Sequence, residues 1–204
     1  MPENSIKAVI FDMGGVFVQT KNKKPRQQLA QHYNVTYDEL SQIVFDSETA
    51  QLATVGKIEE QEHWLAVSKA LNIPFEEMDE FWIKFWSGDE LDIQLVDYAK
   101  SLKGKYQIAL LSNAWGGARD LLTSKYGFLD IFDVSIFSAE AKMAKPDEKF
   151  YLWMTSKLKI QPFEAIFVDD FFENIAPAEK LGMQTVHFLN TRQAIEEIQA
   201  TLKT

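Results

Sequence analysis

Five short, nearly continuous runs of apolar residues divide the chain and predict buried β-strands. Apolar side chains at successive positions, rather than at every second one, are typical of parallel strands that helices cover on both faces. The runs span residues 8–12, 108–113, 134–138, 166–170 and 185–189.

Helical patterns lie between the later runs, where apolar residues recur at spacings of three and four. A chain that alternates strand and helix in this way is typical of a doubly wound, Rossmann-like α/β fold around a parallel sheet. The predicted helices span residues 91–103, 115–126, 147–158, 172–181 and 191–202.

The stretch 19–88 breaks this rhythm, because it carries helical patterns and no convincing strand. It is interpreted as a helical cap inserted after the first strand. The predicted domains are therefore an α/β core of residues 1–18 and 89–204 and a cap of residues 19–88. We expect aromatic residues to form the centre of the cap or its seam with the sheet: Trp64, Phe81, Trp82, Phe85 and Trp86.

Composition narrows the functional classes. The 204 residues are 46% hydrophobic and 25% charged, which is enough apolar surface for a buried core. The net charge of -9 opposes non-specific binding to nucleic acid. The chain has no cysteine, so thiolate nucleophiles, disulfides and cysteine-based zinc sites are excluded.

The apolar runs are all too short to span a bilayer, and the start of the chain, Met1 to Ser5, lacks a signal-peptide pattern. We therefore expect a cytoplasmic protein without a membrane or nucleic-acid partner. Either a monomer or a homodimer is compatible with the sequence.

Carboxylates close two of the predicted strands. Asp12 ends the first, and Asp169 and Asp170 end the fourth. If these strands are neighbours in a parallel sheet, three negative charges meet at one edge and repel one another. A hard divalent cation such as Mg²⁺ relieves that repulsion, and a site of this kind is suited to phosphate chemistry.

Other polar residues follow the remaining strands. Ser112 and Asn113 end the second, the pair Lys145-Pro146 comes after the third, and Asn174 lies one turn into the helix after the fourth. Each has an ordinary structural explanation, such as capping a helix or preceding one. Their common position at strand ends favours a shared site.

Four segments together resemble the motifs of the haloacid dehalogenase superfamily: Phe11-Asp12-Met13-Gly14-Gly15-Val16, Leu111-Ser112-Asn113, Lys145-Pro146 and Phe167-Val168-Asp169-Asp170. The resemblance extends over the whole chain, because the helical insertion is similar to the C1-type cap of that family. Within the superfamily, the chain most resembles small sugar-phosphate phosphatases.

The resemblance implies that Asp12 attacks phosphorus and forms an aspartyl-phosphate. It implies that Mg²⁺ is held by Asp12, Asp169, Asp170 and the backbone carbonyl of Gly14. Lys145 would pair with the phosphate and keep Asp12 ionised.

The resemblance also implies that the phosphate of a small-molecule substrate is bound by Ser112, Asn113 and Gly15. Ser112 would donate its hydroxyl, and Gly15 would allow a close backbone turn. For Trp115, next to this motif, two interpretations stay open: it lines the mouth of the pocket, or it packs against the helix that begins there.

One position departs from the family pattern. Phosphatases of this family usually carry a second aspartate two residues after the nucleophile, as the general acid and base, and here that position is Gly14. No acidic residue occurs between Asp12 and Asp38 to replace it. Candidates for a proton donor from the cap are His32, His63, Glu48 and Glu62.

Three functions are compatible with this sequence. The first is a Mg²⁺-dependent phosphatase that takes its proton from the cap, from water or from the substrate. The second is a regulatory protein that binds phosphate or metal with little turnover. The third is a metal-independent 2-haloacid dehalogenase, which the pair Asp169-Asp170 argues against because adjacent carboxylates favour a metal.

Overall fold

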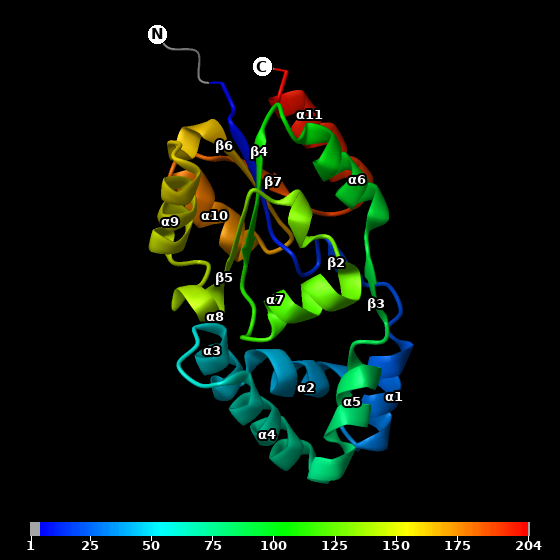
Figure 1. Cartoon of the computed structure of the whole chain (residues 1–204). Helices are drawn as coiled ribbons and strands as arrows, with labels where there is room; N and C mark the ends of the chain where they lie inside the picture. The colour runs from blue at the N-terminus through cyan, green and yellow to red at the C-terminus, as the bar shows by residue number, and fades with distance from the viewer. Residues whose placement is uncertain (1–4, 204) are drawn as a thin grey trace.

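A computed structural model describes residues 5–203 of the chain, so the predicted absence of a signal peptide falls mostly outside the described residues. All five predicted strands are present and run parallel in the order β5-β4-β1-β6-β7. This confirms the predicted doubly wound α/β fold, with β1 at the centre of the sheet (Figure 1). The strands are β1 (Ala8–Phe11), β4 (Gln107–Ser112), β5 (Val134–Phe137), β6 (Ala165–Asp169) and β7 (Gln184–His187).

The two faces of the sheet bury separate hydrophobic clusters, which explains why the strands are apolar at every position. On β1, Val9 and Phe11 contribute to one cluster, and Ala8 and Ile10 contribute to the other. Helices α6 (Ile93–Leu102) and α11 (Thr191–Thr201) cover the first face, and α9 (Glu148–Leu158) and α10 (Phe172–Lys180) cover the second (Figure 1).

The helix predicted over residues 115–126 begins later and changes its winding. It starts as α7 (Ala118–Leu121) and continues as a π-helical turn, η3 (Leu122–Tyr126). Two consecutive glycines, Gly116 and Gly117, explain the later start, since glycine is a poor helix former. The remaining short elements of the core are α8 (Ser138–Ala141) and the 3₁₀ turns η4 (Leu129–Ile131) and η5 (Pro162–Glu164).

The inserted segment is helical, as predicted, and lies at the end of the sheet opposite the two chain termini (Figure 1). It has a hydrophobic cluster of its own, to which Phe81 and Phe85 belong and against which Trp64 and Trp86 pack. We call residues 24–85 the cap segment. Its elements are α1 (Lys24–His32), α2 (Tyr37–Ser41), η1 (Gln42–Asp46), α3 (Glu48–Thr54), α4 (Glu60–Leu71), η2 (Phe75–Glu77) and α5 (Met78–Phe85).

Residues 37–54 of the cap segment form three successive elements, not one continuous helix. A π-helical turn follows α2, and Ser47 then starts α3 by accepting a hydrogen bond from the backbone of Ala50. A serine at this position competes with helix continuation and caps the next helix instead.

An antiparallel ribbon that the sequence pattern did not predict joins the cap segment to the sheet. Its strands are β2 (Val18–Thr20) and β3 (Asp89–Leu91), so the chain enters and leaves the cap segment side by side. Arg26 of α1 makes a buried ion pair with Asp89 at 2.7 Å, which ties the cap segment to the ribbon. The proposed domain boundaries, near residues 18 and 89, fall within this ribbon.

No helix within residues 5–203 combines the length and the apolar character needed to cross a bilayer.

Candidate active site

The three predicted carboxylates meet at the carboxyl edge of the sheet. Asp12 directly follows β1, Asp169 ends the adjacent strand β6, and Asp170 comes next. Each offers one oxygen such that these atoms all lie within 4.8 Å of one another. Residues that are more than 150 positions apart in the chain therefore share one site because their strands pair in parallel.

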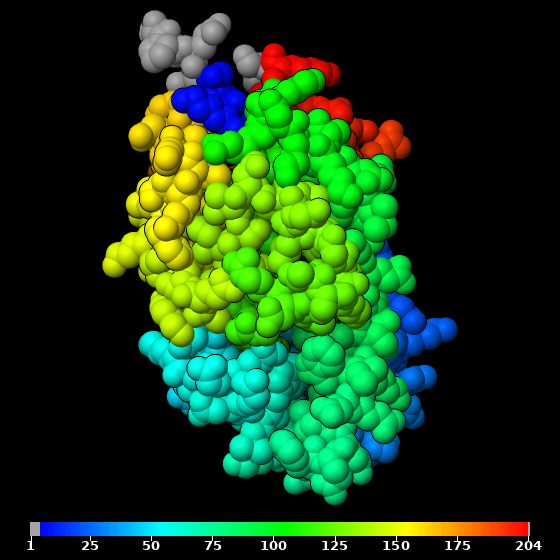
Figure 2. All heavy atoms as spheres, viewed as in Figure 1, coloured from blue at the N-terminus to red at the C-terminus, as the bar shows by residue number. Residues whose placement is uncertain are grey.

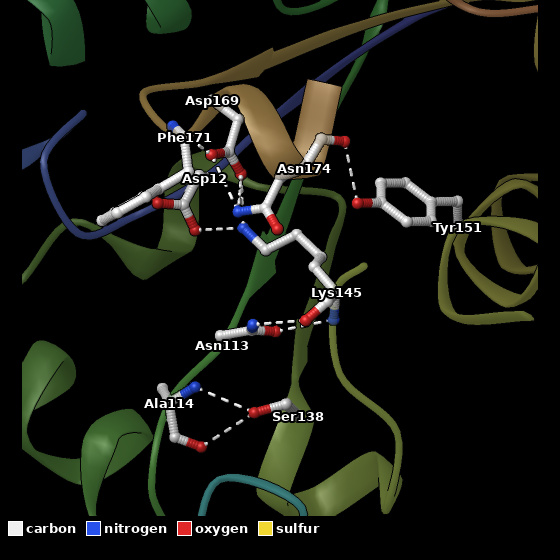
Figure 3. Close-up of polar contacts among 9 residues, drawn as sticks. All are labelled: Asp12, Asn113, Ala114, Ser138, Lys145, Tyr151, Asp169, Phe171 and Asn174. Atoms are coloured by element: carbon white, nitrogen blue, oxygen red, sulfur yellow. Dashed lines mark hydrogen bonds and ion pairs between the residues drawn. The ribbon is translucent and has the colours of Figure 1, made fainter. Parts of the chain in front are cut away.

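Lys145 lies between two of these carboxylates (Figure 3). Its Nζ atom is 2.5 Å from Asp12 Oδ1 and 2.7 Å from Asp169 Oδ2, and all three side chains are buried. Three carboxylates and one ammonium leave an excess of two negative charges. A divalent cation would neutralise that excess.

The electrostatics of the site follow from its burial. Burial raises the pKa of Asp12 to about 7, since the attraction of Lys145 offsets only part of the desolvation and the neighbouring carboxylates add to it. Burial, together with the charge of Asp169, raises the pKa of Asp170 to about 6. Burial lowers the pKa of Lys145, but its ion pairs outweigh that effect and leave the pKa above its usual value.

Asp169 is held in place by several donors. Its Oδ1 accepts a hydrogen bond from the backbone N–H of Phe171 at 2.8 Å, and Asn174 Nδ2 lies 3.0 and 3.1 Å from its two oxygens. Tyr151 in turn donates its hydroxyl to the carbonyl of Asn174 at 2.9 Å (Figure 3). The orientation of this carboxylate is therefore fixed before any ligand binds.

Asp170 is less constrained. Its Oδ1 is buried and has no hydrogen-bond partner among the described residues. Its carbonyl accepts a hydrogen bond from His187 Nε2 at 3.0 Å, so that ring nitrogen carries the proton. An unpartnered carboxylate oxygen beside two further carboxylates fits an oxygen-preferring cation such as Mg²⁺.

Asn113 joins the second and third motifs. Its Nδ2 donates to the carbonyl of Lys145, and its Oδ1 accepts from the backbone N–H of Lys145, both at 2.8 Å. Next to it, the N–H of Ala114 donates to Ser138 Oγ at 2.9 Å. Asn113 thus aligns the lysine, whereas the buried hydroxyl of Ser112 has no partner among the described residues.

The two glycines after Asp12 differ in their surroundings. Gly15 has a φ of +76°, and a Cβ there would lie 2.0 Å from Asp170 Oδ2, so any side chain would displace this carboxylate. At Gly14, by contrast, a Cβ would meet no atom within 4 Å. The position that carries the acid in the family pattern is therefore open space.

Two of the four cap candidates for a proton donor, His63 and Glu62, are held by hydrogen bonds. His63 is fully buried, its ring nitrogens lie 2.9 Å from Thr49 Oγ1 and 3.0 Å from the Val44 carbonyl, and burial lowers its pKa. Glu62 accepts from the backbone N–H of Glu59 at 3.2 Å as part of a capping box. Neither contact points to proton transfer at Asp12.

Comparison with known proteins matches a family model over residues 6–182, that of the haloacid dehalogenase-like hydrolases. The chain belongs to this family. The predicted family is therefore confirmed, and the match covers all four motifs.

Two curated relatives of the haloacid dehalogenase-like chain are phosphatases. The sesquiterpene phosphatase astK of Aspergillus oryzae is 28% identical over 195 residues, which are 95% of each chain. A D-ribitol-5-phosphate phosphatase of Bacteroides thetaiotaomicron is 25% identical over 188 residues, which are 88% of this chain and 90% of the relative.

A solved structure has the same fold as this haloacid dehalogenase-like hydrolase. It is a family enzyme of Bacteroides thetaiotaomicron in complex with magnesium and inorganic phosphate. The TM-score is 0.73 at 24% identity, over 89% of this chain and 93% of that one.

Two residues that support the site were not identified from the sequence. Tyr151 reaches Asn174 from α9, and His187 reaches Asp170 from the end of β7. His187 ends β7, but the run predicted from the sequence continues to residue 189 and places His187 inside the strand. Tyr151 lies within an amphipathic helix and gave no signal of a role at the site.

Proposed function

We propose that the protein is a Mg²⁺-dependent phosphatase that acts on a small phosphomonoester through an aspartyl-phosphate on Asp12. The observation that carries the proposal is the convergence of Asp12, Lys145, Asp169 and Asp170, with their charges only partly balanced. The buried, unpartnered hydroxyl of Ser112 supports a phosphate site at the end of the neighbouring strand.

The residues present fit a bound Mg²⁺. Asp12, Asp169 and Asp170 would hold it through carboxylate oxygens, and Gly14 through its backbone carbonyl. When bound, such an ion offsets the negative charge of the carboxylates and of the phosphate that approaches them.

The protein's own residues would act as follows. An ionised oxygen of Asp12 forms the bond to phosphorus while the bond to the leaving-group oxygen breaks. Lys145 favours the ionised form of Asp12 and pairs with the phosphate, and Ser112 donates its hydroxyl to a phosphate oxygen. Water then attacks the phosphorus of the aspartyl-phosphate, which releases phosphate and restores Asp12.

Gly14 limits the substrates that this site can turn over quickly. General acid catalysis contributes about 10²–10⁴-fold, and Gly14 supplies no proton to the leaving group. Phosphates with good leaving groups, such as aryl and acyl phosphates, depend least on that proton. Alkyl phosphates then need a proton from water, from the cap segment or from the substrate itself.

The relatives support a small organic phosphate as substrate. One is a D-ribitol-5-phosphate phosphatase that covers most of this chain, which favours a sugar phosphate. Another relative that matches over nearly its whole length is a sesquiterpene phosphatase, so an apolar phosphate belongs on the same substrate panel.

Turnover of p-nitrophenyl phosphate with and without Mg²⁺ tests the proposal. We expect phosphate release that requires Mg²⁺ and is lost by at least about 10³-fold in Asp12→Asn, because the amide is a far weaker nucleophile. Asp147→Asn, which alters an exposed helix-capping aspartate on α9, is the control and should keep full activity. An Asp12→Asn protein as active as the wild type would falsify the assignment of the nucleophile.

The absence of an acid at Gly14 also favours a second function, a protein that binds phosphate or Mg²⁺ with little turnover. In that case calorimetry detects binding of inorganic phosphate with Mg²⁺, while a broad phosphomonoester panel yields no product. Halide release from 2-haloacids without metal would instead support a dehalogenase.

A further inference from the structure

The end of β4 leads into a loop that makes contacts with both the sheet and the cap segment. We call residues 112–117 the Ser112 loop. It begins with the buried hydroxyl of Ser112 and ends with the exposed pair Gly116-Gly117. Consecutive glycines give a backbone little rigidity of its own, so outside contacts must set its course.

The sheet side holds only the beginning of this loop. Asn113 is paired with the backbone of Lys145, and Ala114 N–H donates to Ser138. Past Ala114, the loop turns toward the cap segment.

Glu60, the first residue of α4, holds the end of the loop. Its Oε2 accepts a hydrogen bond from the backbone N–H of Gly117 at 2.7 Å, and its Oε1 accepts from Trp64 Nε1 at 2.9 Å. A Cβ on Gly117 would lie 2.8 Å from Glu60 Oε2, so only glycine permits this close approach without movement of the carboxylate. Hydrogen bonds to an ionised acceptor are stronger than those between neutral groups.

Trp115 holds the middle of the loop. Its Nε1 donates to Thr54 Oγ1 at 3.1 Å, and its ring lies 4.6 Å from the His63 ring and 5.4 Å, edge to face, from Trp64. Of the two interpretations of Trp115, the structure therefore favours packing, although the partner is the cap segment and not the helix that follows.

A second contact joins the cap segment to the core near this loop. Lys142 Nζ donates to the carbonyl of Gly56 at 2.6 Å, and a Cβ on Gly56 would lie 2.3 Å from the carbonyl oxygen of Ala139. In the space-filling view the atoms of the cap segment abut those of the core along this line (Figure 2). The cap segment thus contacts the core both at the Ser112 loop and at the end of α8.

We infer that Glu60 and Trp115 are positioning residues that fix the Ser112 loop from the cap side and thereby set its affinity for a phosphate group. This inference rests on the phosphate site proposed above. The Ser112 hydroxyl binds phosphate only in one arrangement of the loop, and the glycine-containing second half of the loop lacks the rigidity to keep that arrangement unaided. By linkage, bound phosphate stabilises the contact between Glu60 and Gly117 to the same degree.

The test measures binding of inorganic phosphate in the presence of Mg²⁺ by calorimetry, together with kcat and KM for p-nitrophenyl phosphate. In Glu60→Ala we expect phosphate affinity to fall about tenfold and KM to rise by a similar factor, as for loss of one charge-assisted hydrogen bond. We expect kcat to change by less than about threefold, because Glu60 does not touch the reacting atoms.

Three further variants sharpen the test. Glu60→Gln retains one acceptor oxygen and should recover part of the lost phosphate affinity. Trp115→Phe retains an aromatic ring but loses the hydrogen bond to Thr54, so its phosphate affinity should be about threefold lower than that of the wild type. Asp79→Ala removes an exposed first-turn acid from another cap helix, α5, and should bind phosphate as the wild type does.

Unchanged phosphate affinity in Glu60→Ala, or a lower melting temperature with the affinity intact, would overturn the inference. A wild-type protein that binds phosphate without turnover overturns only the phosphatase function, and the affinity of Glu60→Ala still decides this inference. A wild-type protein that fails to bind phosphate overturns both.

Discussion

The surroundings of Asp12 fall into a defined side and an open side, which the structure constrains to different degrees. On one side stand Lys145 and Asp169, which are buried and ion-paired, and Asn174 also holds Asp169. On the other side is Gly14, around which there is open space. The side chains suited to binding a cation and a phosphate are rigidly placed, whereas position 14 has no acid that could protonate a leaving group. If Asp12 attacks phosphorus as we propose, the structure constrains the attacking group more than the leaving group.

Removing Lys145 is the most severe way to break the defined side. In Lys145→Met, two buried carboxylates lose their partner, and we expect the free energy of unfolding without Mg²⁺ to fall by about 3–5 kcal/mol. Added Mg²⁺ should restore part of that loss, since it can replace the missing positive charge. Urea unfolding with EDTA or with Mg²⁺ measures both values.

Lys180→Met is the matched control for Lys145. Lys180 forms an exposed ion pair with Glu148, and solvent screens such a pair. Its loss should change stability little. A Lys145→Met protein as stable as this control would mean that the buried ion pairs contribute no net stability.

The open side can be filled. In Gly14→Asp we expect kcat for alkyl phosphates to rise about 10- to 100-fold, with a much smaller gain for p-nitrophenyl phosphate, because only the alkyl leaving group needs the proton. Gly14→Asn is the control of equal size that cannot donate an acidic proton. Equal effects on alkyl and aryl substrates would show that proton donation is not what Gly14 lacks.

A smaller effect is expected from the support of Asp169. In Asn174→Ala, Asp169 loses a donor to both of its oxygens, and we expect the affinity for Mg²⁺ to fall about tenfold. Glu173→Ala, an exposed neighbour on α10, is the control. If both variants bind Mg²⁺ alike in calorimetry, the orientation of Asp169 does not limit metal binding.

A further prediction requires no mutation. Asp12 and Asp170, with pKa values of about 7 and about 6, must both be ionised to bind Mg²⁺, so protons compete with the metal. Affinity should therefore rise from pH 5 to pH 8, by about tenfold per pH unit for each carboxyl that is still protonated, and then level off. Calorimetry across this range measures the slope, and an affinity independent of pH would contradict the raised pKa values.

The same contrast describes what the sequence could predict. The strands and their parallel direction follow from the apolar runs, and the fold confirms them. The meeting of Asp12 with Asp169 requires their strands to be neighbours, and the pairing of β1 with β6 meets that condition. Residue roles at the site remain predictions, because they concern ligands. The open space at Gly14 depends on its three-dimensional surroundings, so the pattern of apolar and polar residues cannot predict it.

Other features escaped prediction for definite physical reasons. The strands of the ribbon have three residues each, too few to set a period. The close approach of Gly15 to Asp170 and the reach of Tyr151 to Asn174 join positions distant in sequence. Such contacts arise from packing, which a single sequence does not encode locally.

The ribbon between the sheet and the cap segment has a consequence for how this molecule can be altered. Thr20 and Asp89 are paired across it, so the whole helical insertion occupies the place of a hairpin turn. A short turn between these two residues would close the hairpin and leave every sheet strand in its present register. A helical module of another length, inserted between the same two residues, would have to offer the Gly117 N–H an acceptor in place of Glu60.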